Sequence, residues 1–474
     1  MRIHSKNQNK IQNTVQKRSR NFLMSTTAFI AGVLMVPSYA HADPANSWDY
    51  DVVLDGNVGK DTSVLGITDI TVTGGNGFVE GNADIYTGHT VNVTGDSSAT
   101  FAYRDNRDNI ESTLNGNLNS NMKIVIIDKD GVFFGSDAQI DVQSIVVTTG
   151  HIVVADIMDG GQLEISDVDQ GGNIVLNGTI SIAEAGLAAF VAPNVTNNGV
   201  INAKLGRVQM GAAQTVTVDL YGDGLLELAL DGELADALLE NNGDIFAEGG
   251  FVQMTALAAK GTVDNIVNNT GIITVASATQ VGGKIVLSGG TQGTVSISGT
   301  LDASGTEGGS VEVRGERILV QNGADIDASG TAGAGGKVTL QTDTLDVTSA
   351  ATFVNVAGAG GTVQIERLTK GRISLGGDSG GLHITQVDID KVNAENLVVG
   401  NASSSENKAT EINVRNFDTT ASISGLTQLN SLSRSLAGGH DNQGDVEFDE
   451  GTNRFNALEV NAVDDVVFRG DVTV

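Results

Sequence analysis

Short alternations of apolar and polar residues recur along the second half of the chain, separated by glycines and small polar residues. In the segment 337–358 the apolar pairs are Val338 and Leu340, Leu345 and Val347, and Val354 and Val356, each flanking one polar residue. Alternation with a period of two is typical of a strand that has one buried and one exposed face. The segment therefore predicts three short strands.

A longer periodicity is superimposed on this alternation. A Gly-Gly-x-(Val/Ile) unit begins at Gly282, Gly308, Gly335 and Gly360, so that it recurs about every 25 residues, and segment 301–306 recurs as 326–331. A repeat of this length with three strands predicts an all-β fold, a right-handed parallel β-helix in which each coil buries its apolar face against the next. A β-sandwich is the alternative, but it does not explain the constant register. Glycine is expected at corners that need a positive φ.

The stretch 219–242 departs from this repeat, because leucines are crowded among acidic residues. Residues 233–240 have helical spacing, with Leu234 and Leu238 on one face. We expect an excursion from the β-helix here, consisting of a hairpin and a short helix.

The N-terminal segment 1–20 contains six Lys or Arg and no acidic residue, and a short apolar run follows it. Ala40 and Ala42 then form a small-x-small cleavage site before Asp43. A basic flank, a short apolar core and such a site predict a signal peptide at 1–42.

The chain has 474 residues, with 27 Lys and Arg against 57 Asp and Glu, which gives a formal net charge of −30. Such acidity argues against nucleic acid and anionic lipid as partners, because both attract basic surfaces. Cysteine is absent, so disulfides, thiol catalysis and cysteine-held metal are excluded. The sequence has no recognisable catalytic or phosphate-binding motif, and no histidine has a second ligand at metal-like spacing. These features predict a protein that is not an enzyme and needs no cofactor or metal.

Several segments before residue 280 carry more specific motifs. In segment 126–135 a turn of Asp128, Lys129, Asp130 and Gly131 is followed by Phe134 and Gly135, and segment 112–118 upstream contains Asn115 and Gly116. Three further segments follow in order at 188–201, 219–226 and 267–273. Together they resemble the secretion domain of the filamentous-haemagglutinin family, the exported partner of two-partner secretion systems. Family members have Asn-Pro-Asn-Gly at the turn, so the proline and both amides are replaced here.

This resemblance implies export across the inner membrane by the general route, then passage through an outer-membrane β-barrel transporter with periplasmic repeat domains. It implies that the N-terminal domain addresses the transporter, and it makes the eight residues named above the expected secretion motif. We therefore expect a non-catalytic, haemagglutinin-like adhesin at the cell surface of a Gram-negative bacterium, meeting a membrane only during secretion. A host-cell receptor or a glycan is its expected adhesive partner.

Four segments follow from these patterns: the signal peptide, a secretion domain at 43–280, regular coils at 281–365 and divergent coils at 366–474. The final strand, 466–474, lacks the polar cap that the end of a solenoid needs, which predicts a truncated product or association with another chain. The alternatives are an autotransporter passenger, a β-helical polysaccharide-degrading enzyme, and a haemolysin or toxin-carrier stalk fragment. A passenger needs a C-terminal barrel of alternating strands, and nothing after residue 365 resembles one.

Arg469, Gly470 and Asp471 spell the tripeptide that many integrin ligands display. A match of three residues arises easily by accident, and this one lies in a predicted strand. It is a candidate for receptor binding.

Overall fold

The computed structural model describes residues 47–48, 50–220, 228–259, 266–351, 353–377, 380–433 and 444–474. The predicted signal peptide and its cleavage residues Ala40, Ala42 and Asp43 lie outside these residues. The chain divides into two units, Met1–Asp43 and Pro44–Val474, and the second is described below.

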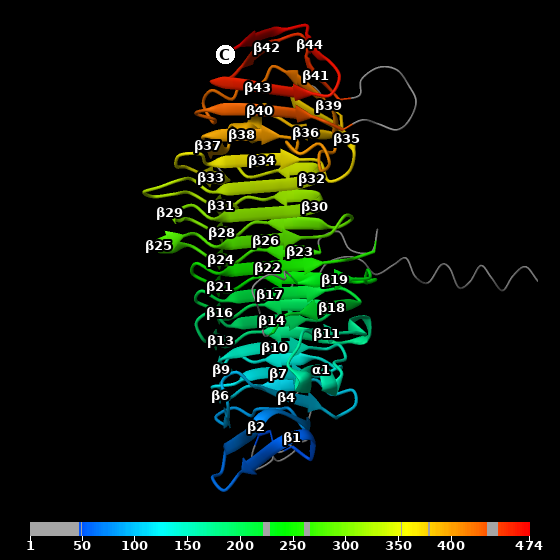
Figure 1. Cartoon of the computed structure of the whole chain (residues 1–474), viewed down its shortest axis with the longest axis vertical. Coiled ribbons are helices and arrows are strands. Elements are labelled where there is room, and N and C mark those ends of the chain that lie inside the picture. Colours follow the sequence, from blue (N-terminus) through cyan, green and yellow to red (C-terminus); the bar gives the residue numbers. More distant parts are fainter. Residues whose placement is uncertain are drawn as a thin grey trace, which may run out of the picture. The chain divides into compact units, whose positions relative to one another are not determined.

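Parallel strands of successive coils pair in order along the unit and form three faces (Figure 1). Face 1 consists of β4 (Thr100–Asp105), β7 (Lys123–Ile127), β10 (Ser144–Thr148), β14 (Leu187–Val191), β17 (Arg207–Ala212), β22 (Phe251–Ala256), β26 (Lys284–Ser288), β34 (Thr362–Glu366), β38 (Asn396–Val399), β40 (Leu426–Ser431) and β43 (Ala457–Ala462). Face 2 consists of β5 (Ser112–Leu114), β8 (Val132–Phe134), β12 (Asn173–Leu176), β15 (Asn194–Asn197), β20 (Leu238–Asn241), β23 (Val267–Asn269) and β27 (Thr294–Ile297).

Face 3 consists of β3 (Thr90–Thr94), β6 (Asn117–Ser120), β9 (Gln139–Val142), β13 (Thr179–Ile182), β16 (Val200–Asn202), β21 (Asp244–Phe246), β24 (Ile272–Thr274), β28 (Thr300–Asp302), β31 (Asp325–Asp327), β33 (Val354–Val356) and β37 (Val392–Ala394). Three longer strands span two faces: β2 (Ile67–Gly81) joins faces 3 and 1, while β30 (Ser310–Val320) and β32 (Lys337–Val347) join faces 1 and 2. The predicted parallel β-helix is confirmed, although the first two strands predicted in 337–358 form the single strand β32.

The length of a coil varies along the chain. Ser310 pairs with Lys337, at an interval close to the one expected from the sequence. Leu187 pairs with Arg207, and Arg207 in turn pairs with Phe251, so the second of these coils contains more than twice as much chain as the first. The long intervals contain insertions, so the strand register is kept while the connections change.

The interior is filled mainly by apolar side chains, and a ladder of asparagines interrupts them. Asn197, Asn241 and Asn269 stack on successive coils inside face 2 and are completely buried. The Asn197 amide donates to Oδ1 of Asn241 at 2.8 Å, and the Asn241 amide donates to Oδ1 of Asn269 at 2.8 Å. Because each amide is satisfied by the next coil, the ladder keeps the coils in register without an unpaired polar group.

The second glycine of the Gly-Gly units has a different cause from the positive φ expected at corners. The second glycines of the Gly-Gly units, Gly283, Gly309 and Gly336, do not have a positive φ. A Cβ atom on Gly309 would lie 2.2 Å from the carbonyl oxygen of Gly283, and one on Gly336 would lie 2.1 Å from that of Gly309. These glycines are required because the backbones of adjacent coils approach too closely for a side chain.

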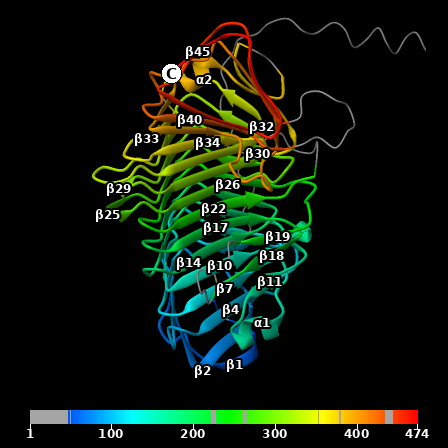
Figure 2. The same ribbon diagram turned by 45° about the horizontal axis from the view of Figure 1, so that its top comes forward.

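Two insertions cover the outer surface of face 1 (Figure 2). The first holds α1 (Val154–Asp159), β11 (Leu163–Ile165) and the 3-10 turn η1 (Val168–Gln170). The second begins with β18 (Thr215–Val218), which pairs antiparallel with β11 and with β19 (Ala229–Asp231). A hairpin is present, but its first strand, β18, precedes the expected stretch 219–242, and its connection, 221–227, lies outside the described residues. The helix expected at 233–240 is wrong, because Leu238–Asn241 is the face 2 strand β20.

The first coil is closed by β1 (Val52–Asp61), which pairs antiparallel with β2. Beneath it the buried Trp48 donates its indole N–H to the Ala83 carbonyl at 2.7 Å, with its ring centroid 4.7 Å from that of Tyr103.

The last coils add further strands. A five-stranded parallel sheet is formed by β35 (Gly371–Gly376), β36 (Leu382–Ile384), β39 (Ala409–Arg415), β41 (Asp445–Phe448) and β44 (Val466–Phe468). Two smaller parallel pairs are β25 (Ser277–Val281) with β29 (Gly305–Glu307), and β42 (Thr452–Arg454) with β45 (Asp471–Thr473). One further helix, α2 (Gln386–Ile389), starts at a capping box formed by Thr385 and Asp388.

Candidate functional site

The turn of the expected secretion motif forms the corner between β7 on face 1 and β8 on face 2. Asp128 closes this turn, because its Oδ1 accepts the Asp130 N–H at 2.9 Å. Its Oδ2 accepts both the N–H of Ser112, at 2.7 Å, and the Ser112 hydroxyl, at 2.6 Å. Gly131 ends the turn at a φ of 127°, where a side chain would be strained. Asp128 therefore ties this corner to the strand of the coil before it.

A second carboxylate lies one coil away. Asp105 is buried at the end of β4, and its Oδ2 lies 3.1 Å from Oγ of Ser112, the hydroxyl that also meets Asp128. One hydroxyl proton serves only one of the two carboxylates at a time, so Asp105 and Asp128 compete for the Ser112 hydroxyl. Burial raises the pKa of Asp128 to about 6, against the lowering effect of the hydrogen bonds from Ser112 and the Asp130 amide.

Arg107 balances the charge of this corner. Its guanidinium makes a two-pronged contact with Asp84, at 2.7 and 2.9 Å, and also contacts Oδ2 of Asp105 at 2.8 Å. Burial alone lowers the pKa of Arg107, but the hydrogen bonds to Asp105 and Asp84 outweigh it and raise that pKa above its usual range. Sequence reasoning missed this network. The available signal was the nearly equal spacing of Asp84, Asp105 and Asp128, which follow one another at intervals of about one coil.

Only part of the motif turn reaches the surface. Lys129 is exposed, and its ammonium group pairs with the exposed carboxylate of Asp108 at 2.6 Å. Asp130 is half-buried and accepts the N–H of Asn109 at 2.7 Å. Asp128 and Gly131 are buried, so a partner of the folded domain meets Lys129 and Asp130 but not the other two.

The remaining motif residues build the opposite corner of the same coils. Phe134 points into the interior and is fully buried. A Cβ atom on Gly135 would lie 1.7 Å from Oδ1 of Asn115, and one on Gly116 would lie 2.5 Å from the carbonyl oxygens of both His89 and Tyr86. These residues allow close stacking of the coils, so the structure brings the motif together as two corners joined by β8.

The insertions on face 1 create a second apolar core beside these corners. Ile152, Ile157, Leu163 and Val216 pack against outward-facing residues of β4, β7, β10 and β14. Arg104 donates to the Ile152 carbonyl at 2.8 Å and lies over the Phe78 ring, 4.7 Å from its centroid. The first insertion was not predicted, because the segment 150–170 carries no repeat marker.

The comparisons with known proteins bear directly on this region. The family model described as the TPS secretion domain matches residues 67–297, which include both motif corners and both insertions. Residues 67–297 of this chain are a TPS secretion domain, which supports a two-partner secretion exoprotein. Proteins with a TPS secretion domain are secreted to the cell surface of Gram-negative bacteria, and this domain implies an outer-membrane transporter as partner. The expected resemblance and the expected localisation are confirmed.

One solved structure supports the fold. The crystal structure of the HMW1 secretion domain from Haemophilus influenzae aligns with a TM-score of 0.54 and 19% sequence identity, covering 88% of this chain and 98% of that chain. The filamentous hemagglutinin secretion domain aligns less closely, with a TM-score of 0.35 and 14% identity, covering 67% of this chain and 100% of that chain. No curated protein matches the sequence significantly.

Among the residues that the structure describes, no helix has the length and apolar character needed to cross a membrane. The same described residues contain no group of three or more His, Asp or Glu side chains placed to hold a metal ion.

The integrin-type tripeptide lies at a corner and not within one strand. Arg469 and Gly470 connect β44 to β45, and Asp471 begins β45. The Arg469 guanidinium pairs with Glu447 at 2.6 Å and with Asp449 at 3.1 Å, both on the preceding coil. Its charge is thus already engaged within the protein.

Proposed function

We propose that this exoprotein is a non-catalytic adhesin whose motif corner at 128–131 is recognised by its outer-membrane transporter, while the coils beyond the TPS domain present the adhesive surface. The observation that carries the proposal is the division of the motif turn into a buried and an exposed part. Asp128 and Gly131 are buried and fix the shape of the corner, whereas Lys129 and Asp130 lie at its surface.

The exposed part offers a compact charged surface. Lys129, Asp130 and Asp108 lie side by side, held by the ion pair between Lys129 and Asp108 and by the hydrogen bond from Asn109 to Asp130. Charged groups at the edge of an interface affect specificity and association rate more than affinity. Replacing the family's Asn-Pro-Asn-Gly by this sequence keeps the turn while changing the surface, so the cognate transporter is expected to complement these charges.

Release into the medium by cells that also express the transporter tests the proposal. Deletion of 43–280 should abolish release. Reversing charge with Lys129→Glu should lower release several-fold without changing the stability of the purified protein, because Lys129 is exposed. The matched control is Lys204→Glu, a reversal at another exposed lysine of the TPS domain, which should be released normally. Normal release of the deletion, or equal release of both lysine variants, would contradict the proposal.

The boundaries 43–280, 281–365 and 366–474, the signal peptide, and a receptor role for Arg469, Gly470 and Asp471 stay predictions. A glycan or host-cell receptor as the adhesive partner belongs to the same proposal. Loss of cell attachment by Arg469→Ala would support the tripeptide as a receptor site.

A further inference from the structure

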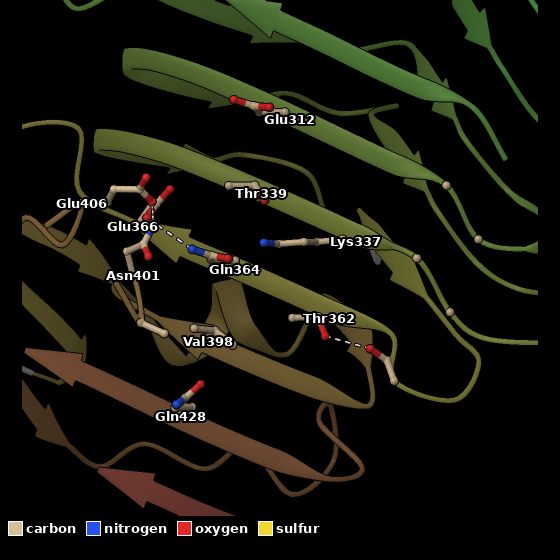
Figure 3. Close-up of a pocket in the computed structure, with 16 residues that line it drawn as sticks. Glu312, Lys337, Thr339, Thr362, Gln364, Glu366, Val398, Asn401, Glu406 and Gln428 are labelled. Atoms are coloured by element: carbon tan, nitrogen blue, oxygen red, sulfur yellow. Dashed lines mark hydrogen bonds between the residues drawn. The ribbon is translucent and has the colours of Figure 1, made fainter. Parts of the chain in front are cut away.

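A polar cleft of about 840 Å³ lies on the outer surface of face 1, beyond the TPS domain (Figure 3). Its floor is formed by β30, β32, β34, β38 and β40. Glycine-rich corners at 308–309, 335–336 and 360 form one wall, and residues 401–406 form the other. Insertions cover the corresponding surface in the TPS domain, but here the surface is open.

The floor presents one side chain per coil in a straight row. Glu312, Thr339, Gln364, Val398 and Gln428 are successive partners in the parallel register of face 1. Adjacent strands lie about 4.8 Å apart, so this row repeats with a spacing close to the length of one sugar ring. The row suits a ligand that is itself a linear repeat.

The charged side chains in the cleft restrict the classes of ligand that it can bind. Among the described residues that line it, Glu312, Glu366 and Glu406 are acidic and Lys337 is the only basic one, while Lys284 on the neighbouring strand β26 pairs with Glu312 at 3.8 Å. Glu366 is buried, and its burial raises its pKa, while Gln364 donates to its Oε2 at 3.3 Å. Three carboxylates against these two ammonium groups leave a net negative charge, which disfavours sulfated, uronic or sialylated chains and nucleic acid.

The side chains and strand pairing of the lining also argue against lipids, amphipathic helices and extended peptides as ligands. Within the described part of the chain, Val398 and Ala402 are its only lining residues with apolar side chains, so it offers no apolar groove for a lipid or an amphipathic helix. Strands β32, β34 and β38 are each paired on both edges, so none of the three offers a free edge to which a peptide could add as a strand. The amide, hydroxyl and carboxylate groups remain, and they match the donors and acceptors of sugar hydroxyls.

We propose that this cleft binds a linear, uncharged oligosaccharide that runs along the β-helix axis, with successive sugars over successive coils. The Glu and Gln side chains of the floor would bind its hydroxyls, and the glycine corners would let it approach the backbone closely. This inference rests on the proposed adhesive function and names the class of its ligand.

Isothermal titration of the mature chain, 43–474, with cellohexaose and chitohexaose tests the proposal, and hexagalacturonate serves as the anionic probe. At least one neutral hexasaccharide should bind with a Kd of about 1 mM or lower, and hexagalacturonate should not bind. Thr339→Trp places a large side chain at the centre of the floor and should weaken binding by about tenfold or more. The control Thr300→Trp introduces the same side chain on face 3 and should bind as the original protein does.

Three results would contradict the proposal that the cleft binds a neutral oligosaccharide. They are no heat of binding from either neutral hexasaccharide at about 10 mM, stronger binding of hexagalacturonate than of both neutral sugars, or unchanged binding by Thr339→Trp. Release through the transporter is measured on the same variants and separates the two proposals. Normal release without sugar binding would contradict the sugar-binding proposal and leave the secretion proposal intact. If the protein binds sugar but is still released after deletion of 43–280, the secretion proposal alone would be contradicted.

Discussion

The coils of the TPS domain and the coils after residue 297, here called the shaft, have the same three faces but use the outer surface of face 1 differently. In β10 and β14 every residue is buried, because the insertions pack on the outside of these strands. In β32 buried residues alternate with partly exposed or exposed ones over most of its length. The same coil therefore supports a second apolar core where insertions fold back on it, and an open polar cleft where they do not.

The two regions also treat charge differently. Arg107, Asp84 and Asp105 form a network that is largely removed from water, whereas Arg317 and Asp346 in the shaft form an ion pair that is 49% and 39% exposed. Removing the partner of a buried charge destabilises the folded protein strongly, whereas removing one member of an exposed pair has little effect because solvent screens the charges. This contrast is open to direct test.

The largest effect is expected for Arg107→Ala. The variant leaves Asp84 and the buried Asp105 without a counter-charge, and breaking such a pair costs about 3–5 kcal/mol of the free energy of unfolding. Arg317→Ala, the matched change in the shaft, should cost less than about 1 kcal/mol. Urea unfolding of both variants at pH 7.5 measures the difference, and similar losses would show that the two networks are equally solvated.

The pH dependence of stability gives the second comparison. The folded state binds the Asp128 proton more tightly than the unfolded chain, since the pKa rises from 3.8 to about 6. This tighter proton binding contributes up to about 3 kcal/mol to the free energy of unfolding. The contribution is fully present below pH 3.8 and is lost as the pH rises through about 6. Asp128→Asn can keep the bond from the Asp130 N–H but turns its own amide NH2 group toward Ser112, and it has no charge to bury. Its stability should therefore fall less between pH 4 and pH 8 than that of the original protein.

Unfolding curves of Asp128→Asn and the original protein from pH 4 to 8 test this expectation. The stability of the original protein should fall by up to about 3 kcal/mol more than that of the variant between pH 4 and pH 8. Asp327→Asn is the control, because Asp327 accepts the Ser329 N–H in the same kind of turn on the shaft but is not fully buried. A parallel pH profile for Asp128→Asn and the original protein would contradict the assignment.

The sequence predicted the solenoid, because alternation and the glycine repeat both follow directly from stacked coils. It missed β20, since Leu234 and Leu238 have helical spacing and Asn241 occupies an interior position that hydropathy assigns to the surface. That asparagine is tolerated inside because Asn197 and Asn269, which are distant in sequence, satisfy its amide from the coils on either side. The Arg107 network was missed for a similar reason, because Arg107 and Asp105 are close in sequence but meet Asp84 only across coils, and a contact of that kind leaves no local pattern.

The smallest effect concerns the feature that both regions share. Gly243 in the TPS domain and Gly309 in the shaft each lie against a glycine carbonyl of the preceding coil, where a Cβ atom would lie 2.1 and 2.2 Å from the oxygen. Alanine at either position should cost about 1–3 kcal/mol in urea unfolding, because the coils must separate to admit it. Gly161→Ala meets no atom within 4 Å and should have almost no effect. Equal losses at Gly243 and Gly309 would show that coil stacking is common to both regions, so that their differences arise from the insertions. A loss confined to one region would mean that the stacking itself differs.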